Sequence, residues 1–276
     1  MKIEKAMAKV RRLQQAAGAA QTAQKEGRRI EKPLKNNASP VYLDSKSLNP
    51  DGDSVIKNRC VGLSTDAPEL DFYKVLRTQV IQLMKPKGWN TLMITSTRPG
   101  EGKTLTSINL SLTIAKAYSQ TVLLVDCDLR QQKIYQYFGL PSDKGIVDYI
   151  LNGSQLKDLI IWPKVEKLTL VSGGRTIGES AELLGSPRMK ELVAEMKARY
   201  DDRYVIFDTP PLLSGADALT FMPLVDGIIM VVQEGRTSMK EVEKAVGLIP
   251  KEKFLGFVLN QAHISKKDGY YQYDAG

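Results

Sequence analysis

The segment that most constrains the fold of this chain runs from residue 90 to residue 109 and reads NTLMITSTRPGEGKTLTSIN. Its apolar start, residues 91–94, is typical of a buried strand, and a Gly/Pro turn follows at residues 99–102. Lys103 and Thr104 then open an amphipathic helix. A strand, a glycine turn, Gly-Lys-Thr and a helix follow each other in this order in phosphate-binding P-loops.

Phosphates need this arrangement because the N–H groups of the turn and the positive end of the helix dipole converge on one point. Lys103 would add a positive charge near the β- and γ-phosphates, and the hydroxyl of Thr104 can ligate Mg²⁺. The full pattern G-x-x-x-x-G-K-[ST] has glycine where this chain has Thr97. A chance G-x-G-K-T is the alternative, but the strand before it and the helix after it favour a real P-loop. The predicted nucleotide-binding residues are Thr97, Arg98, Pro99, Gly100, Glu101, Gly102, Lys103, Thr104 and Leu105.

Charge and composition narrow the class of protein. The chain has 276 residues with 42% hydrophobic content, which suits one sizeable α/β domain with extensions. Residues 1–36 contain ten Lys/Arg and three Glu, so they carry most of the net charge of +8. A basic terminus on a near-neutral body speaks against a nucleic-acid-binding face on the domain. Two cysteines and one histidine give no disulfide framework and no histidine-based site.

The sequence predicts four regions: a basic N-terminal helix over residues 1–26, a flexible linker over 27–60, a P-loop domain over 61–263 and a tyrosine-rich tail over 264–276. The apolar residues of the first helix recur at helical spacing among basic ones, so it is either a solvated helix or one that docks on a membrane or protein surface. The linker holds three prolines and no periodic apolar pattern, which predicts an extended path. With no secretory leader and no apolar run near the ~20 residues of a membrane span, we expect a cytoplasmic protein.

Two further apolar strands end in carboxylates. Residues 121–125 lead into Asp126-Cys127-Asp128-Leu129-Arg130, and residues 204–207 lead into Asp208-Thr209-Pro210-Pro211. Side chains at the carboxyl ends of parallel strands line the ligand crevice. Asp126 and Asp128 fall on one side of the extended chain, and such a pair calls for a cation, for which Mg²⁺ and Arg130 are the candidates. An acidic helix cap is the alternative. Asp208 ends its strand as a Walker B carboxylate does, within reach of Mg²⁺.

The remaining pattern predicts the fold class. Strands are expected at 168–171, 228–232 and 254–260. Helices are expected at 67–84 and 239–248, over 181–200 with a break at Ser186-Pro187, and as short pieces between 145 and 161. Strands that alternate with helices predict an α/β P-loop NTPase fold, with a mostly parallel sheet flanked by helices on both faces.

Two surface features leave alternatives open. Asp71, Lys74 and Arg77 form a charged stripe on the helix at 67–84, which is either a solvated face or a subunit contact. The tail contains Tyr270, Tyr271 and Tyr273, after two lysines and a glycine. These tyrosines are either a phosphorylation substrate or an end that packs on the surface.

Three motifs together, TSTRPGEGKT, LLVDCDLR and VIFDTPP, resemble those of the bacterial tyrosine kinases (BY-kinases) of capsule and exopolysaccharide export. The resemblance runs from about Leu63 to the C-terminus. That family's Walker A motif tolerates a residue other than glycine at its first position, as at Thr97. The motifs are shared with ATPases of the MinD and ParA type, and the Asp-x-Asp-x-Arg form and the tyrosine tail favour the kinases.

The resemblance implies an ATP- and Mg²⁺-dependent protein-tyrosine autokinase that regulates polysaccharide polymerisation and export. Lys103 and the backbone of Gly100–Gly102 would hold the phosphates, and Thr104, Asp126 and Asp208 the metal. Asp126 would accept or orient the proton of the tyrosine hydroxyl, with Asp128 supporting the metal site. Asn260 would lie near the adenine. Neighbouring subunits would phosphorylate Tyr270, Tyr271 and Tyr273 in trans.

The resemblance also implies partners: a homo-oligomer, for which a ring is one arrangement, a separate transmembrane polysaccharide co-polymerase that acts as activator, and a tyrosine phosphatase, with no nucleic acid. The protein would lie at the inner face of the plasma membrane through its partner. The family's oligomerisation helix carries E-x-x-R-x-x-R, whereas this chain has Asp71, Lys74 and Arg77, which predicts weaker or differently matched assembly because Lys lacks the fork of Arg. The alternative function is a MinD/ParA-like ATPase switch without kinase activity.

Overall fold

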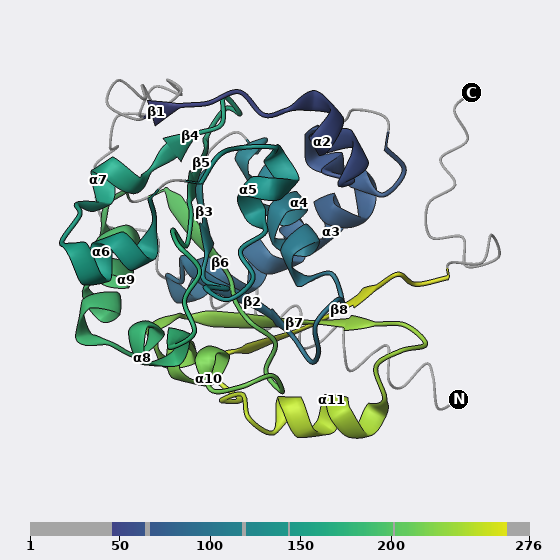
Figure 1. Ribbon diagram of the computed structural model, residues 1–276. Coiled ribbons are helices and arrows are strands. Elements are labelled where there is room, and N and C mark those ends of the chain that lie inside the picture. The colour runs from purple at the N-terminus through teal and green to yellow at the C-terminus, as the bar shows by residue number, and fades with distance from the viewer. Residues whose placement is uncertain (1–45, 64–66, 118–119, 143, 201, 264–276) are drawn as a thin grey trace, which may run out of the picture. The chain divides into compact units, whose positions relative to one another are not determined.

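The apolar segments recognised in the sequence become the neighbouring strands of one twisted sheet (Figure 1). The computed structural model describes residues 46–63, 67–117, 120–142, 144–200 and 202–263, which all belong to one folded unit. The predicted N-terminal helix, residues 27–45 of the predicted linker and the tyrosine-rich tail lie outside the described residues.

Within the described residues the sheet has eight strands in the order β1-β4-β5-β3-β6-β2-β7-β8. The β4–β5 pair is antiparallel and every other pairing among these strands is parallel. All six predicted strands are confirmed. The strands are β1 (Lys46–Ser47), β2 (Thr91–Ser96), β3 (Thr121–Asp126), β4 (Ile161–Trp162), β5 (Leu168–Val171), β6 (Arg203–Asp208), β7 (Gly227–Gln233) and β8 (Phe254–Asn260).

Helices cover both faces of the sheet, as predicted (Figure 1). One apolar core includes residues of α3, α4 and α5, and the other includes residues of α6 to α11. The helices are α2 (Gly52–Lys57), α3 (Leu70–Met84), α4 (Lys103–Ala115), α5 (Ile134–Phe138), α6 (Ile146–Asn152), α7 (Leu156–Leu159), α8 (Ser180–Leu184), α9 (Pro187–Ala198), α10 (Asp217–Phe221) and α11 (Met239–Val246), with 3-10 turns at Val61–Leu63, Lys85–Lys87 and Met222–Leu224.

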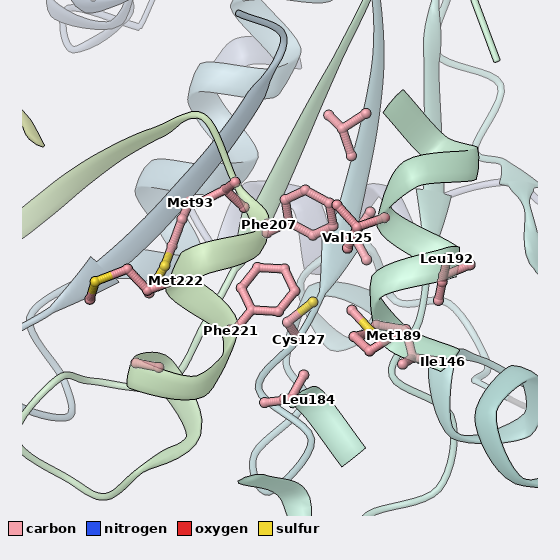
Figure 2. Close-up of a cluster of buried hydrophobic side chains, with 14 of the residues drawn as sticks. Met93, Val125, Cys127, Ile146, Leu184, Met189, Leu192, Phe207, Phe221 and Met222 are labelled. Atoms are coloured by element: carbon pink, nitrogen blue, oxygen red, sulfur yellow. The ribbon is translucent and has the colours of Figure 1, made fainter. Parts of the chain in front are cut away.

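The core on the α6–α11 side contains several sulfur-bearing side chains and a pair of phenylalanine rings (Figure 2). The rings of Phe207 and Phe221 meet edge to face with their centroids 5.0 Å apart, and both side chains are fully buried. Met93, Val125 and Cys127 pack in the same cluster, so the strands that lead to the P-loop and to both acidic motifs share one rigid support. The predicted break at Ser186 is confirmed, because the Ser186 hydroxyl accepts the Met189 N–H and caps α9.

The prediction of a flexible linker is wrong for residues 46–60, which belong to the folded region. Lys46–Ser47 form β1, which pairs with β4, and Gly52–Lys57 form α2, which contacts α5. The Asp51 carboxylate accepts the N–H of Ser54 at 3.0 Å and caps α2, and Leu48 and Val55 pack on the core. A helix of six residues is too short to show an apolar period, so no helical pattern is visible in this segment. The folded region includes residue 46.

The other differences are small and lie in short elements. The predicted helices between 145 and 161 end at Leu159, and Ile161–Trp162 form the strand β4 instead. Helix α5 has five residues and was not predicted. In the described part of the chain, no helix has both the length and the apolar composition needed to cross a bilayer.

Candidate nucleotide-binding site

The P-loop turn has the backbone that the motif predicts. Gly100 and Gly102 have φ of 87° and 94°, a left-handed region that favours glycine. At Gly102 a Cβ would also lie 2.0 Å from Nδ2 of Asn260, so no larger residue fits without displacing that side chain. The turn therefore leads from β2 directly into the N-terminus of α4, where phosphate-binding loops collect their N–H donors.

Lys103, the first residue of α4, points its ammonium group at two of the predicted carboxylates. Its Nζ lies 2.8 Å from Oδ2 of Asp128 and 3.5 Å from Oδ2 of Asp208. The residue is only 7% exposed. Burial by itself lowers the pKa of Lys103, but the charges of Asp208 and Asp128 outweigh burial, so the pKa is raised above its usual value. The lysine is thus a permanent cation held among acidic groups.

Asp208 joins the P-loop helix to the sheet. It ends β6 and lies opposite Asp126 of β3 in the strand register. Its carboxylate accepts the hydroxyl of Thr104 at 2.7 Å and that of Ser107 at 3.3 Å. Burial raises the pKa of Asp208, and Lys103 and Thr104 offset this only in part. Sequence reasoning missed Ser107, although it lies one helical turn after Lys103 on the same face.

Asp126 has its carboxylate directed at the loop that follows β3. It accepts the N–H groups of Asp128, Lys133 and Ile134 at 3.2, 3.0 and 3.1 Å. Burial and the charge of Asp208 raise the pKa of Asp126 to about 7. A carboxylate with this pKa is a suitable proton acceptor near neutral pH.

Arg130 does not neutralise Asp126 and Asp128, so that prediction is wrong. Its guanidinium lies 3.2 Å from Oδ2 of Asp217 and its Nε donates to the Ser180 hydroxyl at 2.8 Å. The cation that faces the acidic pair is Lys103. Arg130 instead connects the loop after β3 to the starts of α8 and α10. It lies two residues after Asp128, and its long side chain extends away from the acidic pair.

Glu101 of the P-loop and Asn260 of β8 have partners that the sequence did not suggest. The carboxylate of Glu101 accepts the N–H groups of Thr97 and Arg98 at 2.7 and 2.9 Å. The side-chain amide of Asn260 donates to the backbone carbonyl of Glu101 at 2.8 Å, so Asn260 contacts the P-loop. Nothing in these contacts tests its predicted place beside an adenine.

The donor set suits a metal that is bound together with phosphates. Among the described residues there is no group of three or more His, Cys, Asp or Glu side chains arranged to hold a metal ion. Mg²⁺ is usually held by one or two carboxylates plus substrate phosphates. The hydrogen bond from the Thr104 hydroxyl to Asp208 brings a hydroxyl oxygen and a carboxylate together beside the P-loop, where both could bind the ion. The residues present therefore fit Mg²⁺ bound with a nucleotide.

The predicted subunit-contact residues lie on the exposed side of α3. Nζ of Lys74 lies 2.8 Å from Oδ1 of Asp71, and both side chains are at least half exposed. Arg77 differs, because its guanidinium donates to the Thr113 carbonyl at 3.0 Å at the end of α4. The predicted phospho-acceptors Tyr270, Tyr271 and Tyr273 lie outside the described residues.

The parallel sheet, the glycine turn and the meeting of Lys103, Thr104 and Asp208 define a P-loop NTPase-type protein. Comparison with known proteins agrees. The AAA domain family matches residues 90–253. The tyrosine-protein kinase YwqD of Bacillus subtilis is 34% identical over 203 residues, covering 73% of this chain and 84% of YwqD. The putative tyrosine-protein kinase CapB of Staphylococcus aureus is 33% identical, covering 66% of this chain and 80% of CapB. The chain belongs to this family of bacterial tyrosine-protein kinases.

Solved structures share this fold. The chimerical protein CapA2B2 superposes with a TM-score of 0.69 at 28% identity, covering 82% of this chain and 96% of that chain. The septum site-determining protein MinD of Pyrococcus horikoshii, solved with Mg-ADP, has a TM-score of 0.52 at 24% identity, covering 64% of this chain and 72% of that chain, which shows a shared fold alone. Some relatives are much longer, and this chain covers 24% of the putative kinase EpsB of Ralstonia solanacearum.

Proposed function

We propose that this protein is an ATP- and Mg²⁺-dependent protein-tyrosine autokinase that phosphorylates Tyr270, Tyr271 and Tyr273 in trans. The observation that carries the proposal is the convergence of Lys103, Thr104 and Asp208 at the carboxyl ends of neighbouring strands, with Asp126 and Asp128 beside them. Membership of a family of tyrosine-protein kinases supports the choice of phosphoryl acceptor.

Phosphoryl transfer asks the protein mainly to position groups and to offset negative charge. The N–H groups of the turn and the ammonium of Lys103 would hold the phosphates of ATP, and Thr104 and Asp208 would hold Mg²⁺. Bound Mg²⁺ would supply positive charge that offsets the charge developing on the transferred phosphoryl group. When ATP binds, the ammonium of Lys103, which lies 2.8 Å from Oδ2 of Asp128, would turn toward the phosphate oxygens.

In this proposal, Asp126 and Asp128 would lie beside the incoming tyrosine hydroxyl. The tyrosine oxygen bonds to the γ-phosphorus as the bond from this phosphorus to the bridging oxygen breaks, which leaves ADP. The proton of the tyrosine hydroxyl goes to Asp126, whose pKa of about 7 suits this task. Because three backbone N–H groups hold its carboxylate, Asp126 is fixed in orientation before the substrate binds.

We further propose that the kinase acts as a homo-oligomer, with Asp71 and Lys74 on the exposed side of α3 at the subunit contact. A ring would present each tail to a neighbouring site. The protein would act in the cytoplasm, at the inner face of the plasma membrane, with a transmembrane polysaccharide co-polymerase as activator and a tyrosine phosphatase as antagonist. The kinase would regulate the polymerisation and export of capsular polysaccharide or exopolysaccharide.

The test is incubation of the full-length protein with Mg-ATP, followed by mass-spectrometric mapping of phosphotyrosine. Wild type should gain phosphate within residues 270–273, whereas Lys103→Met and the triple Tyr→Phe variant should gain none there. Lys190→Met, at an exposed position of α9, is the matched control and should behave as wild type.

A mixing experiment tests transfer in trans. Lys103→Met supplies an intact tail without activity, and the triple Tyr→Phe variant supplies activity without the tail tyrosines. Phosphate should appear on the Lys103→Met chain only when both are present. ATP hydrolysis by wild type without any phosphotyrosine, even with membranes that contain the activator, would instead establish the MinD/ParA-like ATPase.

A further inference from the structure

Glu101 lies at the centre of the P-loop turn, yet it is only 1% exposed. One oxygen of its carboxylate accepts two backbone N–H groups of the same turn, from Thr97 at 2.7 Å and Arg98 at 2.9 Å. A buried carboxylate is costly unless hydrogen bonds satisfy it, so these contacts are a condition for its burial. The side chain thereby links residue 101 to the backbone at the start of the same turn.

The other carboxylate oxygen of Glu101 contacts the hydroxyl of Thr237. Thr237 belongs to the connection between β7 and α11, and its hydroxyl oxygen accepts the N–H of Gln233 at 3.0 Å. A hydroxyl has one proton to donate, and here the carboxylate is its acceptor. A continuous hydrogen-bonded chain therefore runs from the end of β7 through Thr237 and Glu101 to the backbone of the P-loop.

The main chain of Glu101 is held as well. Its carbonyl accepts the amide of Asn260, the last residue of β8, at 2.8 Å. Arg98, in the same turn, forms an ion pair with Glu241 of α11. The turn is therefore attached at Glu101 to the connection after β7 and to the end of β8. Lys103 and Thr104 attach the following helix to the loop after β3 and to the end of β6.

The contact includes Thr97, which stands where the full P-loop pattern has glycine. The N–H groups of Thr97 and Arg98 are taken by the carboxylate of Glu101. The carboxylate of Glu101 thus fixes the backbone conformation of the first half of the loop. Ordering a loop before its ligand arrives removes an entropic cost from binding.

We propose that Glu101 is a positioning residue that holds the P-loop in its nucleotide-binding conformation, and that Thr237 joins this conformation to the β7–α11 connection. The inference rests on the proposed nucleotide binding at the P-loop. In this role Glu101 does not contact the transferred phosphoryl group. Its loss should therefore weaken the binding of nucleotide more than it slows the transfer step.

The test is titration of the full-length protein with Mg-ADP by isothermal calorimetry, with variants compared at equal folded fraction by circular dichroism. Glu101→Ala should raise the Kd for Mg-ADP about ten-fold, equivalent to about 1.4 kcal/mol. Glu101→Gln should recover most of the affinity, because its carbonyl oxygen still accepts both N–H groups and its amide group reaches Thr237. Glu243→Ala, at an exposed position of α11, is the control and should bind as wild type.

A second pair of variants keeps the test valid if Glu101→Ala does not fold. Thr237→Val removes the hydroxyl with little change of shape and should raise the Kd about three-fold, whereas Thr237→Ser should not. In steady-state assays the KM for ATP should follow the Kd, and kcat at saturating ATP should stay within about two-fold of wild type. A purely structural role would lower the unfolding temperature and leave the Kd of the folded protein unchanged.

The outcomes separate this inference from the function on which it rests. A wild-type protein that binds no Mg-ADP overturns both. A wild type that binds Mg-ADP, with unchanged affinity in folded Glu101→Ala or in Thr237→Val, overturns only the role of Glu101. Equal weakening in Glu101→Gln and Glu101→Ala also rejects it, because hydrogen bonding to the loop would then not be what matters.

Discussion

Replacing Lys103 with methionine should destabilise the protein in the absence of nucleotide, and the loss should grow with pH. The ammonium group lies 2.8 Å from Asp128 and 3.5 Å from Asp208, and its charge also acts on Asp126. Methionine fills a similar volume but leaves three buried carboxyl groups without their cation. Removing one partner of a buried ion pair typically costs about 3–5 kcal/mol, so we expect a loss of about 3 kcal/mol at pH 8.

The pH dependence follows from proton binding. Burial and Asp208 already raise the pKa of Asp126 to about 7 with Lys103 in place, and burial raises that of Asp208. Without the ammonium group both pKa values should rise further, whereas in the unfolded chain these groups are ionised above about pH 5. The folded variant then binds more protons than the unfolded chain, so its stability falls as pH rises, by about 1.4 kcal/mol per pH unit for each extra proton. At pH 6 the loss should be about 1–2 kcal/mol smaller than at pH 8.

Urea denaturation followed by circular dichroism at pH 6 and pH 8 measures both values. Lys190→Met, on the exposed side of α9, is the matched control and should change stability by less than about 0.5 kcal/mol at either pH. An equal loss for Lys103→Met at both pH values would refute the argument from coupled carboxylates. Stability equal to that of wild type at pH 8 would refute the ion pair itself.

Three other predictions use the same assays. Asp208→Asn should stabilise the nucleotide-free protein at pH 8 by about 1 kcal/mol, or about 2–4 °C in Tm, while it abolishes phosphoryl transfer, because it removes a buried charge and keeps an acceptor for Thr104. Gly62→Ala should cost about 1–3 kcal/mol, because its Cβ would lie 2.3 Å from that of Leu112, whereas Gly52→Ala has free space and should be neutral in thermal unfolding. Asp71→Lys should shift the assembly to smaller species in analytical ultracentrifugation at unchanged Tm, since the side chain is exposed; an unchanged size distribution would exclude it from the subunit contact.

Much of the site could be predicted because its residues follow strand ends. In a parallel sheet the carboxyl ends of strands meet at one edge, so an apolar run that ends in Asp126 or Asp208 already places that carboxylate near the P-loop. The predicted parallel sheet with helices on both faces is confirmed for the same reason, since its strands and helices carry strong apolar patterns. The first residues of the folded region were missed because β1 and α2 are too short to carry such a pattern.

Partners across the fold were harder to predict than positions along the chain. Arg130 was expected beside Asp126 and Asp128, but its reach takes it to Asp217 and Ser180 on other helices. The contact between Glu101 and Thr237 joins residues 136 positions apart, and no local pattern announces it. Side-chain direction and reach depend on which elements pack together, which a single sequence does not state.

The class of protein could be read from the residues alone, because glycine turns, strand periodicity and helix starts are encoded by neighbouring residues in the chain. The folded structure was needed to show which cation faces the acidic pair, which hydroxyls reach Asp208 and what holds the P-loop turn. These depend on distances of a few ångströms between distant residues, and packing alone sets such distances.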